Sequence, residues 1–287
     1  MFDYPSILLW LAGIMLVIGS YTDIRWRIVP DWLSYSAIIA GIVVRLMHSI
    51  ITVNWYPIVE GMVGFGIFFT LACIAFYTKV WGGGDSKVLM ALGSLIGIWW
   101  VPDHLMFALL TNFLLVGGLY GLGYFIVLGI AHFTKVKNTA AILLSQKAVS
   151  TFHALVYVVL GLFIVAGLIM KSFSFSVLGL GFVMIFYMFV LSKSIEKACF
   201  IKDQPLAKVE EGDWVIEPVV VKGRTLASPK DPGITQEQID EIKRLSKKHH
   251  IKTIKIKEGI PFIPNFLITF LVTLYFGNII FIVMGIL

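Results

Sequence analysis

The residues best suited to chemistry form a polar, glycine-rich break between two long apolar runs, Trp81-Gly82-Gly83-Gly84-Asp85-Ser86-Lys87. A carboxylate at the edge of a bilayer is costly and is rarely kept without a function. Three consecutive glycines allow backbone turns that residues with a Cβ resist, and they leave room for another chain against the main chain. The alternative interpretation is structural: Asp85 is the N-cap of a helix that begins at Ser86, and the glycines form only a turn.

A second carboxylate, Asp23, favours the functional interpretation. It follows the first apolar run, and the helix order places it at the same membrane face as Asp85. Two carboxylates that share one site cannot easily both ionise, so one keeps its proton while the other acts as a base. Such a pair can activate a water for attack on a peptide carbonyl without a metal or another cofactor. Asp31 is the rival for the first position, although Pro30-Asp31 is also typical of a helix start.

The composition is that of a polytopic membrane protein. Hydrophobic residues make up 58% of the chain and charged residues only 14%, which lies outside the range of soluble domains. The net charge of +6 does not indicate nucleic-acid binding, because most Lys and Arg residues lie in one segment after residue 192 and in short loops. Cys73 and Cys199 can form neither a Cys-x-x-Cys site nor a disulfide framework. The first apolar run has no basic n-region and is expected to be a retained helix rather than a signal peptide.

Eight apolar stretches are long enough for transmembrane helices, which need about 17 to 25 residues. In the third stretch, Gly61, Gly64 and Gly66 indicate close packing against another helix. The fifth is too long for a straight span and is expected to tilt or bend. Either all eight cross the membrane or six form a core with two peripheral helices. They are expected at about residues 5–21, 33–50, 57–79, 86–101, 104–133, 152–170, 173–191 and 261–285, with a loop at 134–151 that contains a short amphipathic segment.

The segment 193–258 is polar and charged, and it is expected to be a small cytoplasmic α+β domain inserted before the last helix. Trp214–Val221 and Ile251–Lys257 have the pattern of short strands. Thr235, with Gln238 three residues later, predicts the start of a helix. The fold class is therefore an all-α polytopic membrane protein with this insertion. Its expected parts are a transmembrane core at 1–192, the α+β domain at 193–258 and the last transmembrane helix at 259–287.

The basic residues predict the orientation, because Lys and Arg accumulate in cytoplasmic loops. If the loop after the first helix is cytoplasmic, all of the 23 Lys and Arg residues except Arg45 and Lys171 fall on the cytoplasmic side. We therefore expect a multi-pass protein of the cell membrane with both termini outside. Asp23, Asp85 and the soluble domain then share the cytoplasmic side. Glu60, near the outer end of the third helix, is expected to contact water or Arg45.

Two stretches around the aspartates resemble a known family. Gly82–Gly93 resembles the Gly-x-Gly-Asp motif of the type IV prepilin peptidases, and Tyr21–Asp31 is similar to the first aspartate region of that family. Glu211–Asp213 and Gly259–Pro264 are similar to the C-terminal part of the archaeal preflagellin (prearchaellin) peptidases. The resemblance covers residues 18–101 and 203–275, and the sixth and seventh helices carry no motif.

The resemblance implies an aspartic endopeptidase that removes the short basic leader of archaellin or type IV pilin-like precursors at the cytoplasmic membrane face. Asp23 and Asp85 carry over as the catalytic pair. The expected partners are the leader peptides and the lipid bilayer. Bacterial relatives carry a Cys-containing insertion that accompanies N-methylation, so its absence here implies cleavage alone. The substrate-binding or active-site loop carries over as Gly82, Gly83, Gly84 and Lys87.

Three alternatives stay open at this point. A presenilin-like protease would use the same chemistry inside transmembrane segments, but Asp23 and Asp85 lie near water at helix ends. A cation or proton-coupled transporter would use the aspartates as ligands or relays, although few ionisable residues lie at mid-membrane depth. A non-catalytic assembly subunit would need neither aspartate for precursor processing.

Overall fold

The computed structural model describes residues 6–98, 105–221, 223–231, 233–249 and 252–285. Six helices of this part of the chain are long and apolar enough to cross a membrane, which confirms a polytopic membrane protein. The 27-residue α5 continues unbroken from Leu105 to Ala131, as the single long helix that the sequence predicts. The six are α1 (Ser6–Trp26), α2 (Asp31–Ile51), α3 (Tyr56–Tyr77), α5 (Leu105–Ala131), α7 (Lys147–Ile169) and α8 (Phe173–Ile195).

Two of the expected spans are shorter than predicted. The helices α4 (Gly83–Ile96) and α10 (Ile263–Phe276) have 14 residues each, or about 21 Å at 1.5 Å per residue, against a hydrocarbon core of about 30 Å. Each ends at a glycine with positive φ, Gly97 at 72° and Gly277 at 69°. After Gly277 the chain turns into the short helix α11 (Ile279–Val283), so the predicted continuous last span is wrong.

The helix α1 continues one and a half turns beyond its predicted end at Tyr21. It stops at Trp26, and the next residue, Arg27, has a φ of 62°. Asp23 therefore lies on the helix instead of in the loop that follows it. Because a helix fixes the direction of its side chains, this extension gives Asp23 a defined orientation toward the bundle.

The core of the bundle surrounds α4. Val88, Leu92 and Leu95 of this helix are fully buried, and α3, α2 and α1 pack around it. The helices α3 and α4 approach closely at two glycines: a Cβ at Gly93 would lie 2.7 Å from the carbonyl oxygen of Gly64. Such contacts let two helix backbones touch, as expected of small residues at membrane helix interfaces.

A buried ion pair lies at the C-terminal end of α4. Arg45 of α2 is 1% exposed, and its Nη1 donates to Glu60 Oε2 of α3 at 2.8 Å. Its other nitrogens donate to the carbonyl oxygens of Ser94 and Leu95 at 3.0 and 2.9 Å. These carbonyls belong to the last turn of α4, where no helical N–H is available to them. The expected contact between Glu60 and Arg45 is confirmed.

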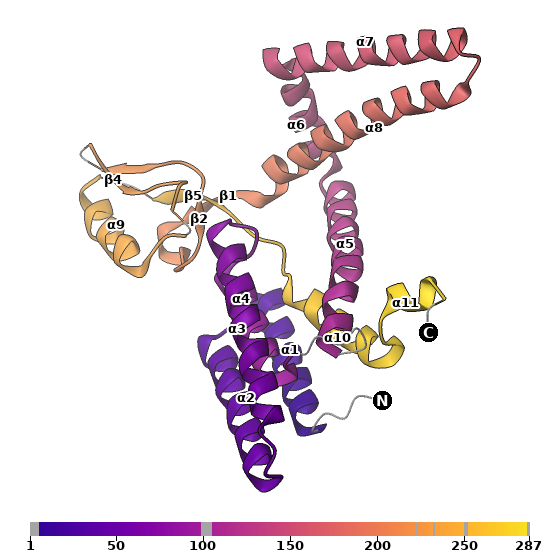
Figure 1. The fold of residues 1–287 in the computed structure, drawn as a ribbon. Coiled ribbons are helices and arrows are strands. Elements are labelled where there is room, and N and C mark those ends of the chain that lie inside the picture. Colours follow the sequence, from indigo (N-terminus) through magenta and orange to yellow (C-terminus); the bar gives the residue numbers. More distant parts are fainter. Residues whose placement is uncertain (1–5, 99–104, 222, 232, 250–251, 286–287) are drawn as a thin grey trace.

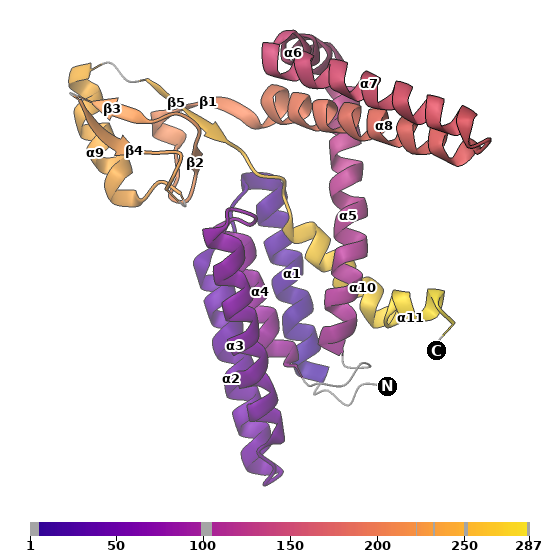
Figure 2. The same ribbon diagram turned by 45° about the horizontal axis from the view of Figure 1, so that its top comes forward.

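The helices α6 (Phe133–Ser145), α7 and α8 stand apart from this core. The amphipathic segment predicted within residues 134–151 is α6, and α7 begins at Lys147, five residues before its predicted start. Figures 1 and 2 show α7 and α8 as a hairpin that projects away from α1–α4 and is joined to them through α5. Most of their apolar side chains are exposed, which suits contact with lipid.

The polar segment before α10 folds into a small α+β module. Its three-stranded antiparallel sheet has the order β1-β5-β2, with a separate hairpin of β3 and β4. The predicted strand over Trp214–Val221 is two strands, and β1 was not predicted. The predicted helix start is confirmed, because Thr235 Oγ1 accepts from Gln238 N at 3.3 Å. The elements are β1 (Ile201–Pro205), β2 (Trp214–Val215), β3 (Val219–Val221), β4 (Arg224–Ala227), α9 (Gln236–His249) and β5 (Thr253–Lys257).

Candidate active site

Asp23 is held at the end of the bundle nearest the polar module. The residue is 7% exposed, and its Oδ2 accepts a hydrogen bond from the backbone N–H of Ile263 at 3.0 Å. Ile263 is the first residue of α10, directly after the linker that leaves β5. Figure 2 shows this linker running from the module along the end of α1. A donor that is 240 residues away in sequence therefore fixes the first candidate carboxylate.

Asp85 lies in the first turn of α4, within the glycine-rich loop. The helix begins at Gly83, so Asp85 is its third residue and not the N-cap of a helix starting at Ser86, which corrects the structural alternative. Its Oδ2 accepts from Gly82 N at 3.2 Å. This contact is the carboxylate half of a capping box, and glycine at the cap position has no side chain to supply the other half. A negative charge is also favoured at a helix N-terminus.

Asp23 and Asp85 lie near each other at the same end of the bundle. They belong to different helices, α1 and α4, and they are close enough for their charges to interact. The closest fit in the loop is at Gly84, where a Cβ would lie 3.0 Å from Val29 Cγ2 in the turn after α1. Gly82 and Gly83 have ordinary space for a Cβ. Gly84 is thus the glycine that allows the loop to approach the α1 turn.

Lys87 pairs with Asp31, the alternative to Asp23 as the first carboxylate of the site. Its Nζ forms an ion pair with Asp31 Oδ1, and the same nitrogen lies 5.6 Å from the ring centroid of Tyr35. Asp31 is the first residue of α2, and its side chain is 63% exposed. The structure accounts for Asp31 as a helix-start residue with a surface partner. Asp23 is the more deeply buried of the two candidates for the first position.

Several residues around the site were not singled out from the sequence. Tyr120 of α5 donates from its hydroxyl to the carbonyl oxygen of Pro261 at 2.7 Å, and so holds the linker that carries Ile263. Tyr124, also of α5, accepts at 2.9 Å from Arg27, which lies in the first aspartate region that the sequence did indicate. The only sequence signal was the proline-containing stretch 259–264, which marked the linker without assigning its contact to Asp23.

The polar module also touches the loop side of the site. Lys79, between α3 and the glycine-rich loop, donates from Nζ to the carbonyl oxygen of Pro229 at 2.6 Å. The module therefore contacts the bundle through Lys79, and the linker that leaves the module leads to Ile263 at Asp23. Its own core, formed by residues such as Ile239, Ile242 and Ile254, is separate from that of the bundle.

These features define a bundle of membrane-type helices with two neighbouring aspartates, Asp23 and Asp85, at one end. Residues 10–122 match the model of the type IV leader peptidase family. The match contains both aspartates and the glycine-rich loop, and it confirms over this stretch the resemblance that the sequence indicates. It does not reach the polar module or α10, so the resemblance of residues 203–275 stays a prediction.

Curated relatives with similarity to the chain are preflagellin peptidases of methanogens. The protein of Methanocaldococcus jannaschii is 32% identical over 104 residues, which cover 36% of this chain and 44% of the relative. That of Methanococcus maripaludis is 28% identical over 102 residues, again 36% and 44% of the two chains. That of Methanococcus voltae is 31% identical over 89 residues, which cover 31% and 38%. The alignment thus spans less than half of each relative. No solved structure matches the chain.

Proposed function

We propose that the protein is a membrane aspartic endopeptidase that removes the leader peptide from archaellin or type IV pilin-like precursors. The observation that carries this proposal is that Asp23 and Asp85, on two different helices, are close enough for their charges to interact. Both lie inside the stretch that matches leader peptidases. The preflagellin peptidases among the relatives support an archaellin precursor as the substrate. The surrounding helices hold Asp23 and Asp85 in position.

The reaction is a hydrolysis by two carboxyl groups that share one proton. The ionised group takes a proton from a water while the water oxygen attacks the carbonyl carbon of the scissile peptide bond. The protonated group donates to the carbonyl oxygen. When the tetrahedral intermediate collapses, the carbon–nitrogen bond breaks and the proton taken from water passes to the leaving amine. As the carbonyl re-forms, a hydroxyl proton of the intermediate returns to the second carboxylate, which restores the pair. Asp23 and Asp85 titrate as one pair in this mechanism.

The site is placed on the cytoplasmic side in this proposal. The support is the distribution of Lys and Arg, because Arg25, Arg27, Lys79 and Lys87 all flank the end of the bundle that carries the aspartates. The polar module lies at the same end, where its contact with Lys79 would keep it near an incoming leader. A basic leader would meet the carboxylates from that side.

The test is a cleavage assay on an archaellin precursor in membranes. Asp23→Asn and Asp85→Asn should each lower the rate by about 100-fold or more, since removing an acid–base group costs about 10² to 10⁴. Asp31→Asn is the matched control and should stay within about threefold, because exposed ion pairs contribute about 1 kcal/mol or less. Normal rates for both Asp23→Asn and Asp85→Asn, at wild-type protein levels, would refute the proposal.

A further inference from the structure

Tyr120 of α5 holds the linker at the point where it reaches Asp23. Its hydroxyl donates to the carbonyl oxygen of Pro261 at 2.7 Å. Two residues further on, the N–H of Ile263 donates to Asp23 Oδ2 at 3.0 Å. The hydroxyl of Tyr120 is also close enough to Asp23 for the two groups to interact electrostatically. One side chain of α5 is therefore connected to the first candidate carboxylate through two hydrogen bonds and a few backbone bonds.

The linker between these two hydrogen bonds has little freedom of its own. Pro261 and Pro264 have fixed φ angles, and Phe262 has helical backbone angles, with φ −104° and ψ −17°. The N–H of Asn265 donates to the carbonyl oxygen of Phe262 at 3.0 Å, which closes a turn at the start of α10. Because few torsions separate Pro261 from Ile263, the position of the Pro261 carbonyl sets the direction of the Ile263 N–H.

The ring of Phe262 connects the linker to the loop that carries Asp85. It lies in an aromatic cluster whose other members are Tyr120, Phe113, Phe266 and Trp81. Trp81 is the residue directly before the glycine-rich loop, and its ring centroid lies 6.3 Å from that of Phe262. The same turn of the linker therefore contacts Asp23 through its backbone and the Asp85 loop through a side chain.

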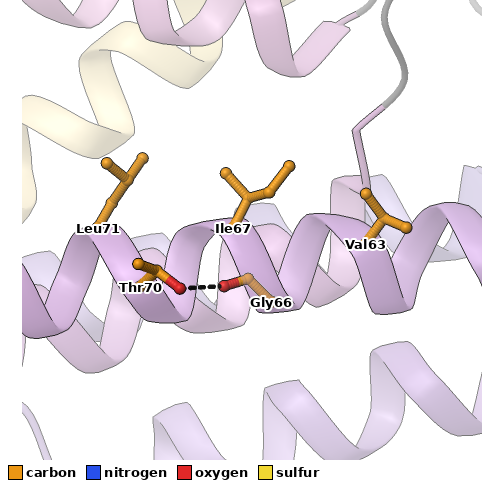
Figure 3. A pocket seen from close by; sticks show the side chains of 5 residues that line it. All are labelled: Val63, Gly66, Ile67, Thr70 and Leu71. Atoms are coloured by element: carbon orange, nitrogen blue, oxygen red, sulfur yellow. Dashed lines mark hydrogen bonds between the residues drawn. The ribbon is translucent and has the colours of Figure 1, made fainter.

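The α3 side of Trp81 is open by comparison. Trp81 lines an apolar hollow of about 310 Å³, and Figure 3 shows the adjoining side of α3, where Leu71 lines the same hollow. The packing predicted for the α3 glycines holds for Gly61 and Gly64, where a Cβ would lie 2.3 and 2.5 Å from atoms of α2 and α4. It is wrong for Gly66, where a Cβ would meet nothing within 4 Å. Among the described residues, the aromatic rings that contact Trp81 belong to α5, the linker and α10.

We propose that Tyr120 is a positioning residue for the catalytic pair and that it acts on Asp23 through the linker. The inference rests on the proposed function and adds to it a residue outside the two aspartate segments. By holding the linker backbone, the Tyr120 hydroxyl aims the Ile263 N–H at Asp23. Since the same turn packs against the Asp85 loop, it orients Asp23 relative to Asp85. Tyr120 transfers no proton, so its loss lowers the rate of the reaction and leaves the binding of the precursor unchanged.

The experiment measures cleavage of an archaellin precursor in proteoliposomes. Tyr120→Phe removes the hydroxyl and keeps the ring in the aromatic cluster. It should lower kcat about tenfold, the upper range for one hydrogen bond, and leave KM within about twofold of wild type. Tyr187→Phe of α8 is the matched control, because its hydroxyl also has hydrogen-bond partners, at 2.9 and 3.1 Å, in the hairpin that stands apart from the bundle. The control should keep kcat within about twofold of wild type.

A second change tests whether Tyr120 acts through the linker. Replacing Ile263 by its α-hydroxy acid exchanges the N–H for an ester oxygen, which removes the donor to Asp23 and keeps the side chain. Two changes in one chain of contacts have non-additive effects on rate. Tyr120→Phe should therefore slow the ester variant by less than about twofold. A further loss of about tenfold would show that Tyr120 acts by another route, and it would overturn the inference.

The outcomes separate the inference from the proposed function. If wild type does not cleave the precursor, the proposed function fails and the inference fails with it. If wild type cleaves and Tyr120→Phe keeps a normal kcat, the inference fails alone. Equal losses of kcat in Tyr120→Phe and Tyr187→Phe would also overturn it, because the effect would not depend on the linker. A loss in Tyr120→Phe alone that the ester at Ile263 abolishes supports the inference.

Discussion

The two ends of α4 are built in opposite ways. At one end Arg45 donates to Glu60, Ser94 and Leu95, and all of these groups are buried. At the other end Asp85, in a loop of three glycines, accepts a backbone hydrogen bond of 3.2 Å from Gly82 N. The helix α4 is therefore anchored at the end far from the site. We propose that its other end, at the glycine-rich loop, is adjustable and that Asp85 moves closer to Asp23 when a substrate binds.

The largest expected effect is at the anchored end. Arg45→Met removes the cation beside Glu60 and the donors to two carbonyl oxygens of α4. Breaking a buried pair by removing one partner costs about 3 to 5 kcal/mol. Thermal unfolding in detergent should show a large loss of stability, and Arg45→Met/Glu60→Met should recover part of it. A stability equal to wild type for Arg45→Met would show that this end of α4 is not an anchor.

The middle of α4 should give the next largest effect. Gly93→Ala places a Cβ 2.7 Å from the carbonyl oxygen of Gly64, and such overpacking costs about 1 to 3 kcal/mol. Gly66→Ala is the control on α3, because its Cβ meets no neighbour. It should stabilise the helix by up to about 1 kcal/mol. Equal unfolding temperatures for the two variants would contradict the glycine contact.

Substitutions in the glycine-rich loop at the start of α4 should change the activity and not the stability. Gly83 is the first residue of α4, where proline is tolerated, and Gly82 has the extended backbone that precedes proline well. Gly83→Pro should keep the unfolding temperature within a few degrees and lower kcat about tenfold, because the loop loses freedom to close. Gly83→Ala, with 3.8 Å to its nearest neighbour, should stay near wild type. A normal kcat for Gly83→Pro would show that cleavage does not require movement of the glycine-rich loop.

The smallest effect belongs to the exposed pair beside the loop. Lys87→Ala breaks the contact with Asp31, whose side chain is 63% exposed. Exposed pairs contribute about 1 kcal/mol or less and are screened by salt. The loss of stability should therefore be small at low salt and should vanish near 1 M salt. A loss that persists at high salt would show that Lys87 does more than pair with Asp31.

Much of the candidate site could be predicted from the sequence because its main signals are local. The glycine-rich loop and Asp85 are adjacent, and Asp23 follows the first apolar run at a charged boundary. The membrane fold followed from long apolar runs. The close packing of Gly64 was likewise predictable from residue size and spacing.

The remaining features depend on contacts between distant residues. Ile263 and Tyr120 reach the site only through the tertiary fold, and neither residue type suggests catalysis. The strand β1 reads Ile-Lys-Asp-Gln-Pro, a weak pattern for a strand, and it forms through pairing with β5. The early end of α4 was hidden because the apolar run continues past Gly97, whose positive φ ends the helix.

The most direct test of the central claim, that Asp23 and Asp85 act as one pair, is a double-mutant cycle on precursor cleavage. Groups that act as a unit have strongly non-additive effects on rate. If they form one pair, Asp23→Asn/Asp85→Asn should cleave no more slowly than the slower single variant. A double variant slowed by the product of the two single losses would show two independent roles. That result would contradict the paired site.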